Sequence, residues 1–371
     1  MQGRVSASQF ALMLTAAYVA SGIFAFPREL VAAAGPNAPY AFGLECAGAL
    51  FGLWMWFRVN RIHPSRPLSF AKDLLTPWLA APTLLMTLLV HIALAVVVVS
   101  DFAFVLHSFF LTETPIFALQ ASLVAVAVYV AWFDVPALAR TVQFIYLLAT
   151  ALSLLIGLLL LPHMTSLYAV VPSPDIAVAP VLLGAYKGSY LFWGYELTVT
   201  LYPLLRPQDR AKAERYAYLA MAATFVFFAL GYILTMGVSG PQLLVNSIWP
   251  GVSTMRLVNI GSFLINKLGL LLVVFWGIFV LTFTAARLWC LAYDVSPLFG
   301  NFSVGWYRGI LLLFSAAVLW CVQAFPTPVH LIAFAQEVMV PVVLLFNLGM
   351  PPLMLLGGVL LRRAPRLQPS T

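Results

Sequence analysis

Charged side chains are scarce in this chain of 371 residues. Asp, Glu, Lys and Arg together make up 8% of it, against about 25% in soluble proteins. The 12 carboxylates and 19 Lys and Arg residues are too few to cover a soluble globule of this length, and apolar side chains make up 63%. Because a helix needs about 20 mostly apolar residues to cross a bilayer, the composition excludes a soluble protein. It predicts a polytopic helical membrane protein.

Cysteine is also rare, and its placement excludes two kinds of site. Cys46, Cys290 and Cys321 lie within or at the edge of apolar runs, without CxxC spacing and without a histidine companion. Neither a disulfide framework nor a zinc site is therefore indicated. The chain also lacks HExxH, GxSxG and a pair of intramembrane aspartates, which intramembrane hydrolytic chemistry would need. We expect no metal, no cofactor and no enzymatic activity.

Ten apolar runs, bounded by proline, glycine or charge, divide the chain. They cover residues 9–35, 37–57, 77–107, 115–133, 141–161, 178–205, 216–237, 265–289, 304–324 and 329–361. We predict an all-α membrane protein of ten transmembrane helices, with one domain over residues 1–371 and two five-span halves at about 9–161 and 178–361. The first run continues through Pro27 into another apolar stretch, so we expect an uncleaved span rather than a signal peptide.

The net charge of +7 is distributed as in a membrane protein rather than a nucleic-acid-binding protein. Fifteen of the 19 basic residues fall at the termini and in the even-numbered turns: Arg4, Arg58, Arg61, Arg66, Lys72, Arg140, Arg206, Arg210, Lys212, Arg215, Arg287, Arg308, Arg362, Arg363 and Arg366. The positive-inside rule then makes both termini cytoplasmic, which agrees with an even number of spans. The two longest outer loops, 162–177 and 238–264, either fold over an outer vestibule or form solvated connectors.

Two spans carry helix-breaking residues in their middle. In span one, Gly22 relaxes the backbone and Pro27 cannot continue the preceding turn. In span six, Gly188 and Gly194 interrupt an apolar run. Interruptions at matching positions of two halves point to a transporter-type substrate site, because half-helix ends can hold the carboxylate and the ammonium of a zwitterion. The alternative is that these residues only kink packed helices.

Ionisable residues inside the spans are the next candidates, because each is costly at the bilayer centre. Glu196, beside the break of span six, is the strongest candidate for a proton carrier or an ammonium partner. A carboxyl group at such a point favours its neutral form unless a cation pairs with it. For Lys187 three roles stay open: contact with Glu45, contact with a carbonyl, or an outward reach to the interface.

Four other intramembrane groups are expected to have mainly structural roles. Glu45, Asp101 and Glu337 lie in spans two, three and ten, and His91 stands alone in span three. We expect a neighbour to satisfy His91, with a proton relay as the alternative.

Several sequence motifs, taken in their order and spacing, resemble those of a known protein family. They are GIFAFPREL from Gly22 to Leu30, FFLTETP from Phe109 to Pro115, FWGYE from Phe192 to Glu196 with Pro203, Ile248-Trp249-Pro250, and the stretch from Asn266 to Phe283. Together they are similar to the spore-germination nutrient receptor B subunits (the GerAB type). The resemblance runs from about residue 8 to 361 and includes the same ten spans.

The resemblance implies a LeuT-like five-plus-five inverted repeat, as in the amino acid–polyamine–organocation transporters, with spans one and six broken. It further implies an integral-membrane germinant receptor subunit in the spore inner membrane, working with an A subunit and a lipoprotein C subunit. The ligand would be L-alanine or another small nutrient. Its implied contacts are Ala20, Gly22 and Ile23 of span one, Phe192, Trp193 and Gly194 of span six, and Thr282 or Thr284 of span eight.

Two functions are compatible with these residues. One is a ligand-sensing receptor subunit that has a transporter fold. The other is a working amino-acid or amine permease, driven by protons through Glu196. Both need the same site at the two breaks, so the sequence does not separate them.

The asymmetry of basic residues makes the topology testable. With both termini cytoplasmic and residues 238–264 outside, cysteines introduced at Ser239 and at Arg363 should react with an impermeant thiol reagent from opposite sides of the membrane. Labelling of both positions from one side would overturn the ten-span topology.

Overall fold

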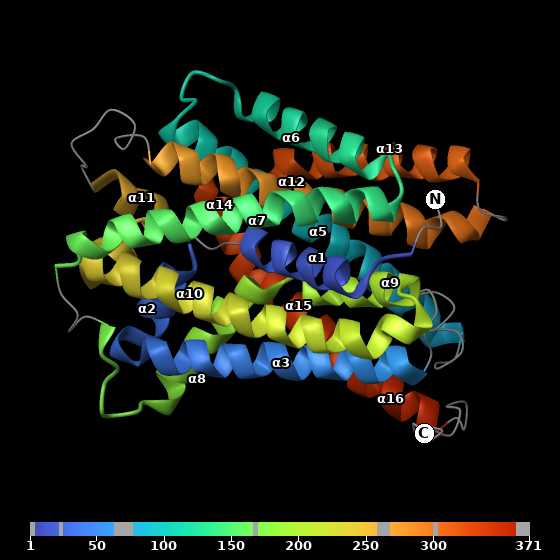
Figure 1. Cartoon of the computed structure of the whole chain (residues 1–371), viewed down its shortest axis with the longest axis horizontal. Helices are drawn as coiled ribbons and strands as arrows, with labels where there is room; N and C mark the ends of the chain where they lie inside the picture. Colours follow the sequence, from blue (N-terminus) through green and yellow to red (C-terminus); the bar gives the residue numbers. More distant parts are fainter. Residues whose placement is uncertain are drawn as a thin grey trace.

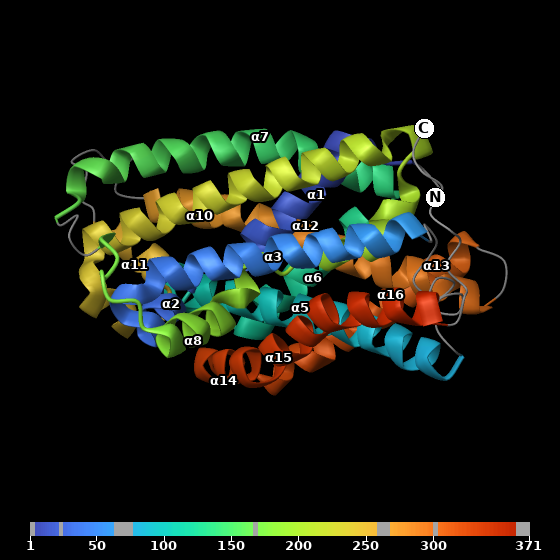
Figure 2. The same cartoon turned by 90° about the horizontal axis from the view of Figure 1, so that it is seen from below.

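The computed structural model describes residues 4–21, 25–62, 77–165, 170–257, 268–299 and 303–360, and this part is almost entirely helical. Its α-helices form one elongated bundle (Figures 1 and 2). They are α1 (Ala7–Ala20), α2 (Phe26–Ala34), α3 (Ala38–Ile62), α5 (Pro77–Phe109), α6 (Ile116–Ala131), α7 (Val135–Leu160), α8 (Val178–Gly188), α9 (Thr198–Leu201), α10 (Arg210–Asn246), α11 (Pro250–Leu257), α12 (Leu268–Val295), α13 (Val304–Cys321), α14 (Pro328–Phe334), α15 (Val340–Leu344) and α16 (Met350–Leu360). The predicted all-α polytopic class is confirmed.

Both predicted helix breaks are present. Span one consists of α1, which ends at Ala20, and α2, which begins at Phe26; residues 22–24 lie outside the described part of the chain. Pro27 lies in the first turn of α2. The N–H groups of a first turn have no partner within the helix, so the missing N–H of proline costs no hydrogen bond there. In span six, α8 ends at Gly188 and two short 3₁₀ turns, Ser189–Phe192 and Tyr195–Leu197, precede α9. The helices of spans one and six are thus interrupted in the two segments that the glycines and Pro27 indicated.

The number of spans stays a prediction. Seven helical segments of the described chain are long and apolar enough to cross a membrane, and the apolar helices α1 and α6 are shorter. The predicted outer loop 238–264 needs a correction: α10 continues through a kink at Gly240 (φ 71°) to Asn246, and α11 follows. The part from 238 to 257 is therefore largely helical rather than an open connector.

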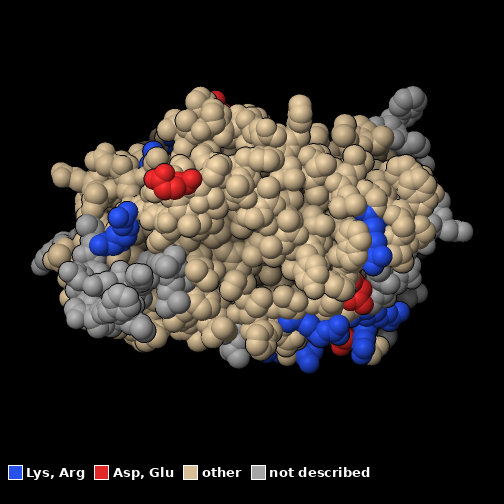
Figure 3. Space-filling view, turned by 90° about the horizontal axis from the view of Figure 1, so that it is seen from above, with Lys and Arg blue, Asp and Glu red and all other residues tan. Residues whose placement is uncertain are grey.

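The outside of the bundle has the polarity of a membrane protein. Large apolar side chains such as Phe144, Leu158 and Trp320 are exposed along the helices, which is the expected surface for contact with lipid. Figure 3 shows Lys and Arg side chains near the two ends of the bundle, while the middle of that face carries none. α1 begins and α16 ends at the same end of the bundle (Figure 1).

Small residues allow the helices around the breaks to pack closely. α8 packs against α2 and α3 (Figure 2), and a Cβ atom added at Gly184 would lie 2.8 Å from Ala41 Cβ and 2.9 Å from Ala34 Cβ. One added at Gly52 of α3 would lie 2.7 Å from the hydroxyl oxygen of Tyr195. Gly52 of α3 and Gly184 of α8 therefore serve close contacts inside the chain.

We expect Gly184→Ala to destabilise the protein. The new methyl group would clash with two methyl groups on rigid helices, so α8 would have to move, at a cost of about 1–3 kcal/mol in the free energy of unfolding. Thermal unfolding in detergent measures this loss. Gly43→Ala on α3 is the matched control, because nothing lies within 4 Å of its added Cβ. Equal midpoints for the two variants would show that the contact is not tight.

Candidate functional site

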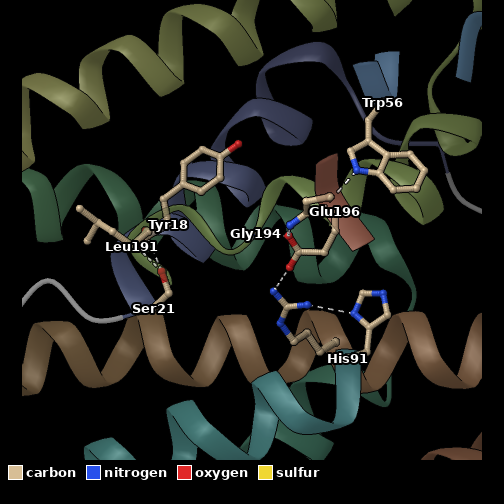
Figure 4. Close-up of polar contacts among 9 residues, drawn as sticks. Tyr18, Ser21, Trp56, His91, Leu191, Gly194 and Glu196 are labelled. Atoms are coloured by element: carbon tan, nitrogen blue, oxygen red, sulfur yellow. Dashed lines mark hydrogen bonds and ion pairs between the residues drawn. The ribbon is translucent and has the colours of Figure 1, made fainter. Parts of the chain in front are cut away.

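The two helix breaks lie against each other and are joined by one hydroxyl group. Ser21 Oγ lies 2.8 Å from the carbonyl oxygen of Tyr18 and 2.9 Å from that of Leu191, so its proton is shared between one carbonyl of each broken span (Figure 4). Backbone freed from helical pairing finds no partner in lipid. The side chain of Ser21 therefore meets a need that both breaks create.

Gly194 brings the break of span six into contact with α1. A Cβ atom at this position would lie 2.6 Å from Ala17 Cβ and 3.2 Å from the carbonyl carbon of Ala17. Its amide donates to Glu196 Oε2 at 2.8 Å. Glycine is thus required here by the close approach of two backbones, and its freed N–H is satisfied by a carboxylate two residues on.

Glu196 is the centre of a fully buried polar cluster (Figure 4). Its Oε1 accepts a hydrogen bond from Nη2 of Arg287, and Oε2 accepts from Asn347 Nδ2 at 3.5 Å in addition to the Gly194 amide. Arg287 Nη1 also lies 3.0 Å from His91 Nδ1. Because a guanidinium group only donates, His91 Nδ1 must be the acceptor, which makes this histidine neutral with its proton on Nε2.

Other side chains extend this cluster across the bundle. Trp56 Nε1 of α3 donates to Asn347 Oδ1 at 3.2 Å, and the guanidinium of Arg287 lies 4.1 Å from the centre of the Phe283 ring. The ion pair thus joins span six to α12, and its neighbours reach α3, α5 and the π-helical turn Leu345–Gly349. A pair with this many hydrogen bonds can exist in a medium of low dielectric constant.

Arg287 corrects the count of basic residues. From the sequence it was counted with a cytoplasmic turn, although the predicted span runs to residue 289. In the structure it is buried inside α12, which continues to Val295. Without it, 14 of the basic residues support the predicted orientation, which is still a clear majority. The partner of Glu196 was missed because a charge near the end of a span was counted with the following turn; the apolar residues that continue to Ala292 were the signal.

The predicted ligand-binding residues lie in different surroundings. Gly22 and Ile23 fall outside the described residues. The carbonyl oxygen of Ala20 accepts from Trp276 Nε1 at 3.3 Å. Thr282 and Thr284 donate to carbonyl groups of their own helix, Phe279 O at 3.0 Å and Val280 O at 2.8 Å, so their hydroxyl protons are engaged.

Phe192 and Trp193 point to different neighbours. The ring of Phe192 packs edge-on against Phe225 of α10 at 4.8 Å between ring centres, within a cluster of aromatic side chains. Trp193 is buried and lies 5.8 Å from the ring of Tyr190. Span six therefore directs one aromatic side chain into the packed core and keeps the other beside the break.

Several buried polar groups at the breaks have no hydrogen-bond partner within the described part of the chain. They are Tyr18 Oη, Tyr190 Oη, Trp193 Nε1 and Thr198 Oγ1. Buried polar groups are nearly always paired in folded proteins, so such a concentration is the expected property of a binding site. Of these residues the sequence indicated Trp193; Tyr18, Tyr190 and Thr198 were signalled only by being polar residues next to the breaks.

Two cavities flank α1, but they do not reach Trp193. The larger, of about 350 Å³, is lined by apolar residues of α7, α10 and α12 together with Val19. The smaller, of about 190 Å³, adds Thr15, Thr150 and Thr224 to a similar apolar wall. Both adjoin the last turn of α1, directly before Ala20. Among the described residues no three His, Cys, Asp or Glu side chains are grouped as a metal site.

The remaining ionisable groups divide into paired and unpaired ones. Asp101 accepts from Trp249 Nε1 at 2.8 Å, which ties the segment before α11 to α5. Arg28 pairs with Glu29 at 3.4 Å. The two carboxylate oxygens of Glu45 have no partner in the described chain, so the suggested contact with Lys187 is not made. Glu337 is exposed.

Comparison with known sequences points to one family. A family model described as spore germination protein, the spore permease family, matches residues 4–326. Spore germination protein KB of Bacillus subtilis (strain 168) is 27% identical over 270 residues, which cover 71% of this chain and 70% of that protein.

Solved structures of similar fold are transporters. Mhp1, a nucleobase-cation-symport-1 family transporter solved in a closed conformation with bromovinylhydantoin, matches 97% of this chain and 79% of its own with a TM-score of 0.69 and 15% identity. MhsT, solved in complex with L-phenylalanine, matches 98% of this chain and 100% of its own with a TM-score of 0.65 and 13% identity. At this identity the likeness shows the fold alone, and it confirms the LeuT-like architecture.

Removing one partner of the buried ion pair should be far more costly than removing both. Glu196→Gln leaves the Arg287 charge unpaired, and Arg287→Met does the same to Glu196, at about 3–5 kcal/mol of unfolding free energy each. The double variant should lose markedly less than the sum, because no unpaired charge remains. Thermal unfolding of the four proteins measures the coupling.

The control is Glu337→Gln, which removes an exposed carboxylate and should change stability by at most about 0.5 kcal/mol. If the effects of Glu196→Gln and Arg287→Met were additive, Glu196 and Arg287 would not depend on each other.

Proposed function

Because the chain belongs to the spore germination protein family, we propose that it is the integral-membrane subunit of a spore germinant receptor that binds a small nutrient, such as an amino acid, where spans one and six break. The proposal includes location in the spore inner membrane, with both termini cytoplasmic, and assembly with A and C subunits. These partners come from the resemblance to the receptor family.

One observation supports the proposal that the ligand binds at the breaks. The polar atoms that lack partners in the described chain include a hydroxyl of α1 (Tyr18), a hydroxyl following the break (Thr198) and an indole N–H within it (Trp193). An unsatisfied buried polar group costs about 1–3 kcal/mol. A bound nutrient would recover this energy by giving these groups partners.

The helix ends at the breaks suit a zwitterion. The carbonyl groups at the C-terminal end of α1 carry partial negative charge that attracts an ammonium group, and the N-terminal end of α2 carries partial positive charge that attracts a carboxylate. Trp193 adds a flat apolar surface with one N–H donor. This set of groups favours a small amino acid with an aliphatic side chain over a purely ionic ligand.

Glu196 supports a receptor more than a proton-coupled permease. A proton carrier needs a carboxyl group that gains and loses its proton during the cycle, whereas Glu196 is held by Arg287, an amide and Asn347. In this arrangement its charge is neutralised by the guanidinium and its acceptors are used. We therefore propose that the Glu196–Arg287 pair holds the broken span in place and that nutrient binding acts on that span.

A direct experiment separates receptor from permease. Purified protein in proteoliposomes would be tested for binding of radiolabelled alanine and, in parallel, for its uptake with and without a proton gradient. Binding without uptake supports the receptor. Saturable uptake driven by the proton gradient would establish the permease instead, and absence of binding to any of a panel of amino acids, amines and sugars would contradict the nutrient site.

Trp193→Ala tests the wall of the site. The smaller side chain should open space at the break of span six and move the preference from alanine towards valine and leucine. Ligand-induced thermal stabilisation by the three amino acids gives the ranking in wild type and variant. Trp320→Ala removes the same side chain from a position that is 79% exposed on α13, so it should leave the ranking unchanged. An unchanged ranking in a folded Trp193→Ala protein would place the indole outside the pocket.

A further inference from the structure

Glu45 of α3 is a buried carboxyl group separate from the Glu196 cluster. Glu45 is 5% exposed, and neither of its carboxylate oxygens has a hydrogen-bond partner in the described chain. The other buried acidic residues of the described chain differ in this respect: Glu196 binds Arg287, Glu214 binds Arg61 and Tyr202, and Asp294 accepts from Thr200. Glu45 therefore needs an explanation of its own.

Glu45 lies where the two broken spans come together. A Cβ atom added at Gly188, the last residue of α8, would be 2.7 Å from Glu45 Oε2 and 3.0 Å from Leu30 Cδ2 of α2. α2, α3 and α8 pack against one another on this side of the breaks (Figures 1 and 2). The carboxyl group thus lies at the junction of the α2 half of span one and the α8 half of span six.

The groups around Glu45 supply no opposing charge. On α2, Arg28 and Glu29 pair with each other, and no ion pair joins Lys187 of α8 to Glu45 within the described residues. Gln336, in the π-helical turn Ala335–Met339, donates to the carbonyl oxygen of Lys187 at 3.1 Å, while its own Oε1 lacks a partner. The hydroxyl of Tyr190 also lacks one, and the next residue of α3, Cys46, carries a free thiol.

An ionised Glu45 would be opposed by two effects. A carboxylate without a partner is costly in a medium of low dielectric constant. The C-terminal end of α8 at Gly188 also carries partial negative charge, which repels an anion. Both effects vanish when a proton neutralises the carboxyl group, and a proton is the cation that fits between Leu30 and Gly188 without displacing them.

We propose that Glu45 is a proton-binding site at the junction of α2, α3 and α8: the protonated carboxyl group allows the two half-helices to pack closely, and release of the proton to the aqueous phase loosens α8. The equilibrium involves only one O–H bond, which breaks to give a carboxylate and a proton. It goes beyond the proposed nutrient site, because the pH would then control how firmly that site is covered on one side.

The first test observes the proton itself. Infrared difference spectra of the purified full chain in nanodiscs, recorded between pH 5 and 9, should contain the C=O stretch of a protonated carboxyl group that disappears as the pH rises. Glu45→Gln should abolish this band, and Glu337→Gln, the exposed matched control, should leave it in place. A wild-type protein that shows no protonated carboxyl band at any pH in this range would overturn the proposal without any variant.

The second test observes the helix. Hydrogen–deuterium exchange of residues 178–188, corrected for the pH dependence of the chemical step, should become faster with rising pH, by up to about tenfold per pH unit for one linked proton. Glu45→Gln, which mimics the neutral form, should keep these amides protected at every pH. Equal pH dependence in wild type and Glu45→Gln, or a dependence on sodium or potassium concentration at constant pH, would refute a proton at Glu45.

These outcomes are independent of the proposed nutrient site. Glu45→Gln retains Tyr18, Trp193 and Thr198, so alanine should still stabilise the variant at low pH. Failure of alanine to bind either protein would contradict the nutrient site and leave the infrared and exchange results to decide on Glu45.

Discussion

The ion pair between Glu196 and Arg287 is the interaction on which the centre of the molecule depends. An interrupted helix inside a membrane leaves amide and carbonyl groups without partners, and the carboxylate of Glu196 takes up the amide of Gly194 that the break releases. That carboxylate is itself possible only because a guanidinium neutralises it. The broken span, the charge and the counter-charge therefore form one arrangement in which each part requires the other two.

The local features of this arrangement could be predicted from the sequence, while the long-range ones could not. Glycine and proline act on their own backbone, so Pro27, Gly188 and Gly194 indicated both breaks correctly. Arg287 acts on a residue 91 positions away, and nothing in its own surroundings names that partner. Because no sequence rule names the partner, a charge near the end of an apolar run was counted with the turn that follows it.

The candidate site shows the same division. Trp193 could be singled out because it belongs to the FWGYE motif that carries the family resemblance and stands beside Gly194 of the break. The engagement of Thr282 and Thr284 with their own helix depends on side-chain rotamers, and the unpaired state of Glu45 depends on which groups of α2 and α8 fail to reach it. Such properties arise from packing between segments, which residue types and spacing do not encode.

The position of the ion pair in the chain has a consequence for biosynthesis. Span six leaves the ribosome before α12, so Glu196 enters the membrane while its counter-charge is not yet made. Arg287 then enters within α12, where an arginine at the middle of a helix adds about 2.5–3.5 kcal/mol to the free energy of insertion. The earlier carboxylate can receive it. The pair thus offsets part of the cost of inserting one helix with a charge on another that is synthesised earlier, and the order of synthesis becomes part of how the structure is reached.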